Sequence, residues 1–314
     1  MTDSRKKVII KDSTLREGLD TPTVSFTMKQ RLKIAVLLNK AKVQEIELAA
    51  PGNFLKDLEF ARALKDQRLK IRTSGLIYAH SPLLREEIRE GGNCLDRFDI
   101  LMPVSLKRRP YDKKSKIKLL LDALDYSLSR HPDVGVGFPH STQVDTRFLA
   151  EIGKKAAKNG AKRITVYDTS GRSDPFEIHA LIKRLKKGLD VPLFFHGHND
   201  LGLATANSLS AVYAGADGLD LTINGLGDRA GNASLEQVTL GLHLKGLNTG
   251  IILKDLKLMS ETLAEMSNIP LSKLAPVVGD FVFFHKSPGH LEAPELFEAF
   301  DPRLIGEKRC LTKR

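Results

Sequence analysis

Eight short apolar runs recur along this chain at intervals of about 20 to 35 residues, and helical patterns lie between them. The runs predict strands over 8–14, 43–50, 70–79, 97–104, 134–140, 163–170, 192–199 and 218–225. Helical periodicity predicts helices over 29–42, 116–130, 147–159, 175–187 and 204–214. Such an alternation over about 240 residues is typical of a (β/α)8 barrel. An open doubly wound sheet would more often carry a glycine-rich loop after its first strand, where this chain has TLREG. The sequence therefore predicts an α/β fold, a (β/α)8 TIM barrel.

The repeat ends near residue 248, which predicts two parts of unequal size. Residues 1–250 are expected to form the barrel, which would be the catalytic domain. Residues 251–314 are expected to form a short helical and irregular lid subdomain, with a helix over 255–268 followed by a tail broken by proline and glycine. This segment is too short to enclose a core of its own. We therefore predict that it covers a barrel, either its own or that of a partner subunit.

Composition restricts the class of protein. The chain has no run of 18 apolar residues and no signal peptide, so we expect no membrane association and a cytoplasmic location. Cys94 and Cys310 have no metal-binding or disulfide spacing, which predicts free thiols. The net charge of +11 comes without a basic motif interleaved with aromatic residues, so no nucleic-acid partner is expected. A small anionic substrate or a phosphate-bearing cofactor would suit the basic residues 107–109.

Two histidines, His196 and His198, stand two positions apart at the end of the seventh predicted strand. Alternate side chains of a strand share a face, so both imidazoles point the same way. They could be two hydrogen-bonded core histidines or two corners of a metal site. Glu17 follows the first strand, and strand ends of a barrel meet at one face, so its carboxylate can approach both imidazoles. Two imidazoles and one carboxylate bind a divalent cation and leave positions open for water and substrate.

Three motifs resemble one family of barrel enzymes over residues 8 to about 310. They are DSTLREG at 12–18, HGHNDLGLATANSLSAVYAGAD at 196–217 and NGLGDRAGNASLEQV at 224–238. Together they are similar to the DRE-TIM metallolyases, which include 2-isopropylmalate, homocitrate and citramalate synthases and 3-hydroxy-3-methylglutaryl-CoA lyase. The resemblance implies a divalent metal ion, Mg, Mn or Zn, held by Glu17, His196, His198 and Asn232. It also implies that Arg16 is catalytic and points at the oxygen of a 2-oxo acid.

The resemblance favours the condensing members of the family, which join acetyl-CoA to a 2-oxo acid. The lyases carry a cysteine in the loop after strand 8, whereas this chain has GDRAGN at 227–232. The stretch FHKSPGH is similar to the lid of the synthases and places His290 as the group that transfers a proton at the acetyl methyl. The nearby His285 is interpreted as mainly structural. The family also implies a homodimer, because a lid often reaches over a neighbouring barrel.

Several positions depart from the family pattern. Asp20 stands where the family usually has Gln, and Phe297 stands where the synthases carry a lid tyrosine. His140 is the only titratable group directly at the end of strand 5, where an acidic pair is usual. The residues predicted to contact substrate are Asp20, Arg109, His140 and Thr169.

The resulting hypothesis is an acyltransferase that performs a metal-dependent Claisen condensation of acetyl-CoA, or a similar acyl-CoA, with a 2-oxo acid. The product would be similar to a 2-alkylmalate or homocitrate, as in amino-acid biosynthesis. Two alternatives stay open. One is a retro-aldol or acyl-CoA lyase reaction on the same scaffold. The other is a relative that binds metal and 2-oxo acid without catalysis.

Overall fold

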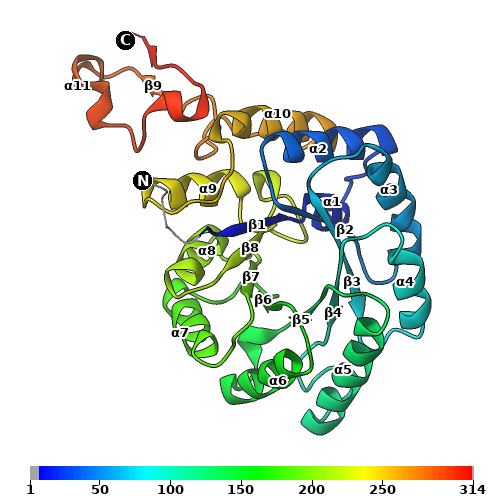
Figure 1. Ribbon diagram of the computed structural model, residues 1–314. Coiled ribbons are helices and arrows are strands. Elements are labelled where there is room, and N and C mark those ends of the chain that lie inside the picture. The colour runs from blue at the N-terminus through cyan, green and yellow to red at the C-terminus, as the bar shows by residue number, and fades with distance from the viewer. Residues whose placement is uncertain (1–6, 313–314) are drawn as a thin grey trace, which may run out of the picture.

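Eight parallel strands close into a barrel in the computed structural model of the protein, which describes residues 7–312 (Figure 1). They are β1 (Ile9–Asp12), β2 (Glu45–Ala49), β3 (Arg72–Tyr78), β4 (Arg97–Leu101), β5 (Val134–Phe138), β6 (Ile164–Asp168), β7 (Leu193–Gly197) and β8 (Gly218–Leu221). Strand β1 pairs with both β2 and β8, which closes the ring. The predicted TIM barrel is therefore confirmed, and each predicted strand contains one observed strand.

Helices surround the barrel, and their boundaries follow recognisable capping residues. They are α1 (Thr14–Glu17), α2 (Met28–Lys40), α3 (Phe54–Asp66), α4 (Leu84–Gly91), α5 (Lys113–Leu128), α6 (Thr146–Lys158), α7 (Pro175–Lys186), α8 (Ala204–Tyr213), α9 (Leu235–Leu244) and α10 (Leu256–Ser267). Helix α7 begins with a capping box between Asp174 and Glu177 and has Pro175 in its first turn. Gly160 after α6 and Gly215 after α8 have positive φ, as a helix-ending glycine should. Helices α1, α3, α4 and α9 were not among the predicted ranges.

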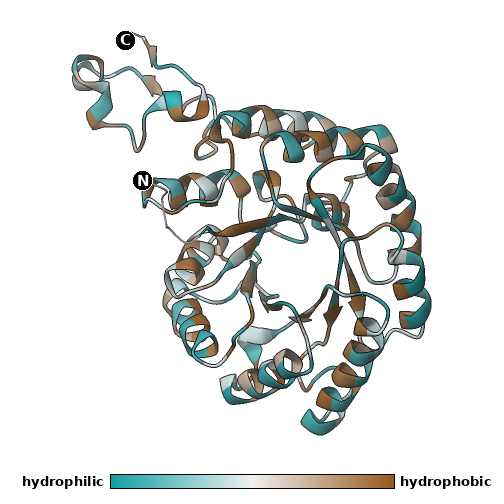
Figure 2. Cartoon of the chain, viewed as in Figure 1, coloured by the Kyte–Doolittle hydropathy of each residue, from teal (hydrophilic) through white to brown (hydrophobic). Residues whose placement is uncertain are grey.

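The hydrophobic core lies between the strands and the ring of helices. Outward-facing strand residues such as Ile10, Ile77 and Val166 belong to it and are almost completely buried. Figure 2 shows this division, with strands largely hydrophobic and helices hydrophobic on part of their surface only. No helix within residues 7–312 is long and apolar enough to cross a membrane.

The interior of the barrel, by contrast, contains a network of buried charged side chains. Lys11 on β1 donates to Glu47 on β2 at 2.5 Å and lies 2.9 Å from Asp220 on β8. Arg163, just before β6, binds Glu45 through two hydrogen bonds of 2.8 and 2.9 Å and also pairs with Asp99. These charges are tolerated only because each faces an opposite charge. The network joins β1, β2, β4, β6 and β8 across the lumen.

The C-terminal part does not cover the mouth of its own barrel. Helix α10 packs against α2 and against the short helix η3 (Ile223–Gly225), so it lies with the barrel helices. The remaining chain contains β9 (Phe284–His285), α11 (Pro288–Glu292) and β10 (Cys310–Leu311), and β9 pairs with β10. Figure 1 shows this segment outside the ring of helices, beside α9 and α10. The boundary at residue 250 stays a prediction, as does the role of a lid.

Replacing Arg163 by Leu should lower the free energy of unfolding by about 3–5 kcal/mol, because Glu45 and Asp99 would remain buried without a countercharge. The measurement is urea unfolding at constant pH. The control is Lys118→Ala, which removes an exposed ion pair with Asp122 and should change the value by less than about 0.5 kcal/mol. Equal midpoints for the two variants would contradict the importance of the network.

Candidate metal centre

Glu17 reaches the mouth of the barrel because the chain turns into a short helix directly after β1. The backbone carbonyl of Ser13 accepts hydrogen bonds from the amides of Arg16 and Glu17, which fixes this turn. Asp12 accepts from the backbone amide and the hydroxyl of Thr14, each at 2.9 Å. The Thr14 hydroxyl in turn accepts from the amide of Ile223, so the turn is tied to the segment after β8.

The two histidines lie at the end of β7 and face the barrel interior, as the alternation predicts. His196 is at the penultimate position of the strand, and His198 follows its end. The Nε2 atom of His196 lies 3.2 Å from Nε2 of His198 and 3.2 Å from Oε1 of Glu17. One donor atom from each of these three residues lies within 4.8 Å of those of the other two. The structure therefore brings together the three residues predicted as a metal centre. We call Glu17, His196 and His198 the metal cluster.

Asp220 on β8 fixes the orientation of His196. Its carboxylate lies 3.3 Å from Nδ1 of His196, so Nδ1 carries the hydrogen and Nε2 faces Glu17. Burial by itself lowers the pKa of His196, but hydrogen bonding to Asp220 and Glu17 outweighs it and raises the pKa. Burial and the neighbouring His196 lower the pKa of His198 to about 3, so this imidazole is neutral at physiological pH. A neutral imidazole is the form that binds a metal.

The carboxylate of Glu17 is held in its charged form. Burial would raise its pKa, yet Arg16 and the two imidazoles outweigh burial and hold the pKa well below the usual range. A buried carboxylate beside two imidazoles is a donor set that suits a divalent cation.

Asn232 enters the same cluster from the loop after β8. A β-bridge joins it to His198, and its side-chain amide lies 3.1 Å from Nε2 of His196. Its Oδ1 atom is buried without a hydrogen-bond partner in the described structure, as is Nδ1 of His198. A Cβ atom at Gly227 would stand 1.8 Å from Oδ1, so glycine leaves the space that this amide occupies. The unpaired amide oxygen fits the predicted fourth ligand, and the cluster as a whole fits a divalent metal ion.

Arg16 is held rigidly beside the cluster. It pairs with Glu17, and its Nε donates to Glu47 at 2.6 Å. Its Nη2 atom is buried and has no partner within residues 7–312. Desolvation lowers the pKa of the guanidinium, but Glu17 and Glu47 outweigh it and raise the pKa, so the charge is permanent. Arg16 can thus offer one fixed hydrogen-bond donor to an anionic or carbonyl oxygen.

The residues predicted to contact substrate are spread around the rim. The hydroxyl of Thr169 accepts from the amide of His140 at 2.8 Å, so these two residues are neighbours. Asp20 is exposed at the end of the short helix η1 (Gly18–Asp20). Arg109 lies in an exposed loop, where its Nε is 3.3 Å from the hydroxyl of Tyr111. Their roles as substrate contacts stay predictions.

His290 is surrounded by residues of its own C-terminal segment. Its ring stacks on Phe297 with centroids 3.8 Å apart, and its Nδ1 lies 3.3 Å from Nδ1 of His285. His285 in turn lies 3.1 Å from Glu298, which also accepts from Arg309 at 2.8 Å. Because this segment lies beside the barrel, one chain does not bring His290 to the metal cluster (Figure 1).

Sequence reasoning missed Glu47, Asp220 and Lys11, which orient the predicted residues. Each is a charged residue inside an apolar strand, and Glu47 repeats the inward position of Glu45. Their signal in the sequence was a charged residue at an inward position of a buried strand. Such a charge needs an oppositely charged partner inside the fold.

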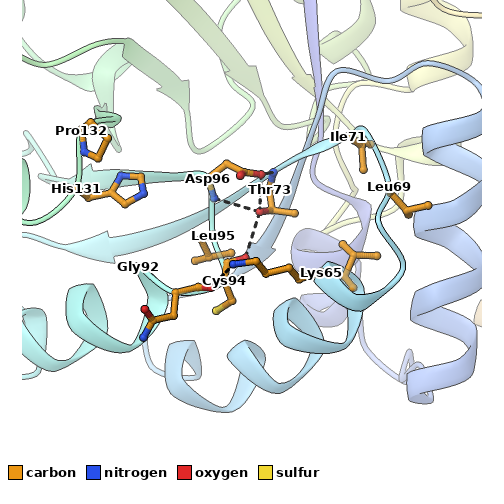
Figure 3. Close-up of a pocket in the computed structure, with 12 residues that line it drawn as sticks. Lys65, Leu69, Ile71, Thr73, Gly92, Cys94, Leu95, Asp96, His131 and Pro132 are labelled. Atoms are coloured by element: carbon orange, nitrogen blue, oxygen red, sulfur yellow. Dashed lines mark hydrogen bonds between the residues drawn. The ribbon is translucent and has the colours of Figure 1, made fainter.

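A separate cavity of about 360 Å³ lies at the opposite end of the barrel (Figure 3). It is lined by Thr73 at the start of β3, Asp96 before β4 and His131 before β5. Figure 3 shows the hydrogen bonds between Thr73 and Asp96. Barrel enzymes carry their sites at the carboxyl ends of the strands, so this cavity is not the candidate site.

The family profile described as HMGL-like matches residues 7–263, which include every barrel strand and the whole metal cluster. The chain belongs to the HMGL-like family of DRE-TIM barrels. The resemblance of the three sequence motifs to this family is thereby confirmed.

The similar curated proteins include several synthases. A 2-isopropylmalate synthase of Methanocaldococcus jannaschii is 36% identical over 313 residues, covering 96% of this chain and 60% of that protein. Homocitrate synthase 1 of Nostoc sp. is 31% identical over 97% of this chain and 82% of its own length. A putative (R)-citramalate synthase, CimA, of Archaeoglobus fulgidus is 31% identical over 97% of this chain and 64% of its own length. The chain thus spans about 60% of the length of the first of these relatives.

Solved structures share the fold at low sequence identity. An HMG-CoA lyase from Acinetobacter baumannii, in complex with coenzyme A and 3-methylmalate, has a TM-score of 0.76 and 19% identity, covering 89% of this chain and 98% of that chain. The carboxyl transferase domain of Rhizobium etli pyruvate carboxylase has a TM-score of 0.70 and 16% identity, covering 87% of this chain and 52% of that one. These similarities support the barrel and do not choose between the reactions.

Changing Glu17 to Gln should weaken Mn²⁺ binding by at least about tenfold, because the variant loses the only carboxylate among the proposed ligands. Metal binding is measured by calorimetry, and metal content after purification by elemental analysis. Asp228→Asn is the matched control, since this carboxylate lies near the mouth but pairs with Arg229. Full metal occupancy in the Glu17 variant would remove Glu17 from the ligand set.

Proposed function

We propose that this protein catalyses a metal-dependent Claisen condensation in which an acyl-CoA, such as acetyl-CoA, adds to a 2-oxo acid. The observation that carries the proposal is the convergence of Glu17, His196, His198 and the unpaired Nη2 of Arg16 at one buried point. The relatives named 2-isopropylmalate, homocitrate and citramalate synthase support it.

The donor set suits the recognition of a 2-oxo acid. When bound, a divalent cation would polarise the keto group and stabilise negative charge on its oxygen. Arg16 supplies the complementary donor from the protein, and Glu47 holds its guanidinium in place. A fixed guanidinium needs no reorganisation as charge develops on the keto oxygen, which is the main requirement for electrostatic catalysis.

The second requirement is a base that removes a proton from the acetyl methyl. The methyl carbon then forms a bond to the keto carbon, and hydrolysis of the thioester releases free CoA. His290 is our candidate for this base, and the position of its segment supports its delivery to the barrel of a second copy (Figure 1). We therefore propose a homodimer in which each active site combines Glu17 of one chain with His290 of the other.

The decisive assay measures the release of CoA thiol from acetyl-CoA by the protein with Mn²⁺, Mg²⁺ or Zn²⁺. We expect release only when a 2-oxo acid is present, because the methyl carbanion needs the keto carbon as its acceptor. A 2-alkylmalate-type product, identified by mass spectrometry, must appear in equal amount. Cleavage of such a product without its synthesis would favour the lyase alternative. Binding of metal and 2-oxo acid without proton exchange at the acetyl methyl would favour a non-catalytic relative.

Mixing two inactive variants tests the shared site. His290→Ala should lower turnover far more than the affinity for the 2-oxo acid, and Glu17→Gln should abolish metal-dependent activity. After the two variants are unfolded and refolded together, half of the dimers would be mixed, and each mixed dimer would contain one intact site. The expected recovery is therefore about a quarter of wild-type turnover. No recovery from a mixture that forms dimers would overturn the shared site.

A further inference from the structure

Near the metal cluster, the inward-facing side chains of the barrel are charged on one side and apolar on the other. Strands β7, β8, β1 and β2 contribute the charged groups that hold the cluster, including Asp220, Lys11 and Glu47. On the other side, Leu76 of β3, Leu101 of β4 and Tyr167 of β6 form a small hydrophobic cluster separate from the main core, and Tyr78 of β3 packs against it. We call these four residues the apolar wall.

The apolar wall stands directly against the metal cluster. Tyr167 is paired with His196 in the register of β6 and β7, and their ring centroids are 4.7 Å apart. The ring of Tyr167 therefore lies against the imidazole of His196, next to the metal cluster.

Between Leu101 and Tyr167, strand β5 contributes a glycine, so the two larger side chains can contact each other. The strand residue between them is Gly137, and a Cβ atom there would stand 2.5 Å from Leu101 and 3.0 Å from the ring of Tyr167. The glycine therefore lets two large side chains meet across a strand and close the wall. Leu76, Leu101 and Tyr167 are only 2%, 4% and 6% exposed, so little space remains above the wall for a bulky group.

None of the four side chains of the wall carries a charge that could pair with a second carboxylate. Lys11 and Arg163, two buried cations of the ion network, are paired with carboxylates, and the free Nη2 of Arg16 belongs to the metal cluster's side of the barrel. His80 and His140 follow the ends of β3 and β5, and partial burial, followed by the charges of Arg108 and Lys116, lowers the pKa of both. A second carboxylate packed against these four neutral side chains would be buried without a charged partner from the wall.

One polar atom of the wall is unused. The hydroxyl of Tyr167 is buried and has no hydrogen-bond partner within residues 7–312. Buried polar groups are normally hydrogen-bonded, and this hydroxyl is therefore free to bond a molecule that binds beside the metal cluster.

We propose that the apolar wall, with the ring of Tyr167 at its centre, restricts this site to 2-oxo acids whose substituent is short and uncharged, of the size of pyruvate or 2-oxobutyrate. This inference rests on the proposed function and narrows its substrate class. The carboxylate and keto groups face the metal cluster and Arg16, and the substituent faces the wall. The Tyr167 ring limits its length, and the Tyr167 hydroxyl offers one hydrogen bond to the bound acid.

The test compares pyruvate, 2-oxobutyrate, 2-oxoisovalerate and 2-oxoglutarate by kcat/KM in the thiol-release assay and by calorimetric binding to the Mn²⁺-loaded protein. We expect the wild type to favour pyruvate or 2-oxobutyrate over the two larger acids by at least about tenfold, since a misfitting methylene in an apolar pocket costs this much. A preference for 2-oxoisovalerate or 2-oxoglutarate would overturn the inference.

Two variants distinguish the effect of the Tyr167 ring from the effect of its hydroxyl. Tyr167→Ala should raise the ratio of 2-oxoisovalerate to pyruvate at least tenfold, whereas Tyr167→Phe should weaken binding of all four acids alike and leave the ratio within about threefold. Val166→Ala on the outward face of the same strand is the matched control and should also leave the ratio unchanged. If Tyr167→Ala does not fold, Leu101→Ala opens the same wall and should shift the ratio in the same direction.

The proposed wall and the proposed condensation can fail independently of each other. An unchanged ratio in folded Tyr167→Ala and Leu101→Ala, or an equal shift in Tyr167→Phe, would overturn the wall as the specificity determinant. Selective binding of the short acids without release of CoA would support the wall and refute the condensation.

Discussion

The position of Asp220 is the constraint on which the metal centre depends. This carboxylate lies between Lys11 and His196, at 2.9 Å from the ammonium and 3.3 Å from the imidazole. Burial would raise its pKa, but Lys11 and His196 outweigh burial and keep it charged. The ion network of the barrel interior is thus continuous with the metal cluster. The same charges that close the lumen also select the ring nitrogen that His196 presents to a metal.

Much of the fold was predictable because its signals are local and repeated. Strand-length apolar runs and helix caps such as Asp174 follow from nearby residues, and eight repeats leave few topologies. Glu17, His196 and His198 could be predicted as a cluster because strand ends of a barrel share one face. Their orientation could not be predicted, because the contacts of Asp220 and Glu47 depend on the register between strands that are distant in sequence. The position of Tyr167 beside His196 could not be predicted either, since a tyrosine in an apolar strand is usually a residue of the hydrophobic core.

The C-terminal segment marks the limit of sequence reasoning in this protein. The stretch around His290 predicts a proton-transfer residue by resemblance, but no local pattern determines where a short irregular segment lies. In the structure the polar contacts around His290 come from its own segment, through His285 and Glu298, whereas Glu307 of the segment pairs with Lys257 of α10. These contacts hold the His290 imidazole within its own segment, and its delivery to a second barrel stays a proposal.

The two-sided lumen separates tasks among the strands. The residues that would hold a metal come from β1, β7 and the loop after β8, whereas the wall comes from β3, β4 and β6, with Gly137 of β5 between them. Substitutions on the second group can alter the volume beside the metal without removing any ligand. Under the proposed function, one or two substitutions in the wall would change which 2-oxo acids an evolving lineage accepts, while the residues that would bind the metal stay the same.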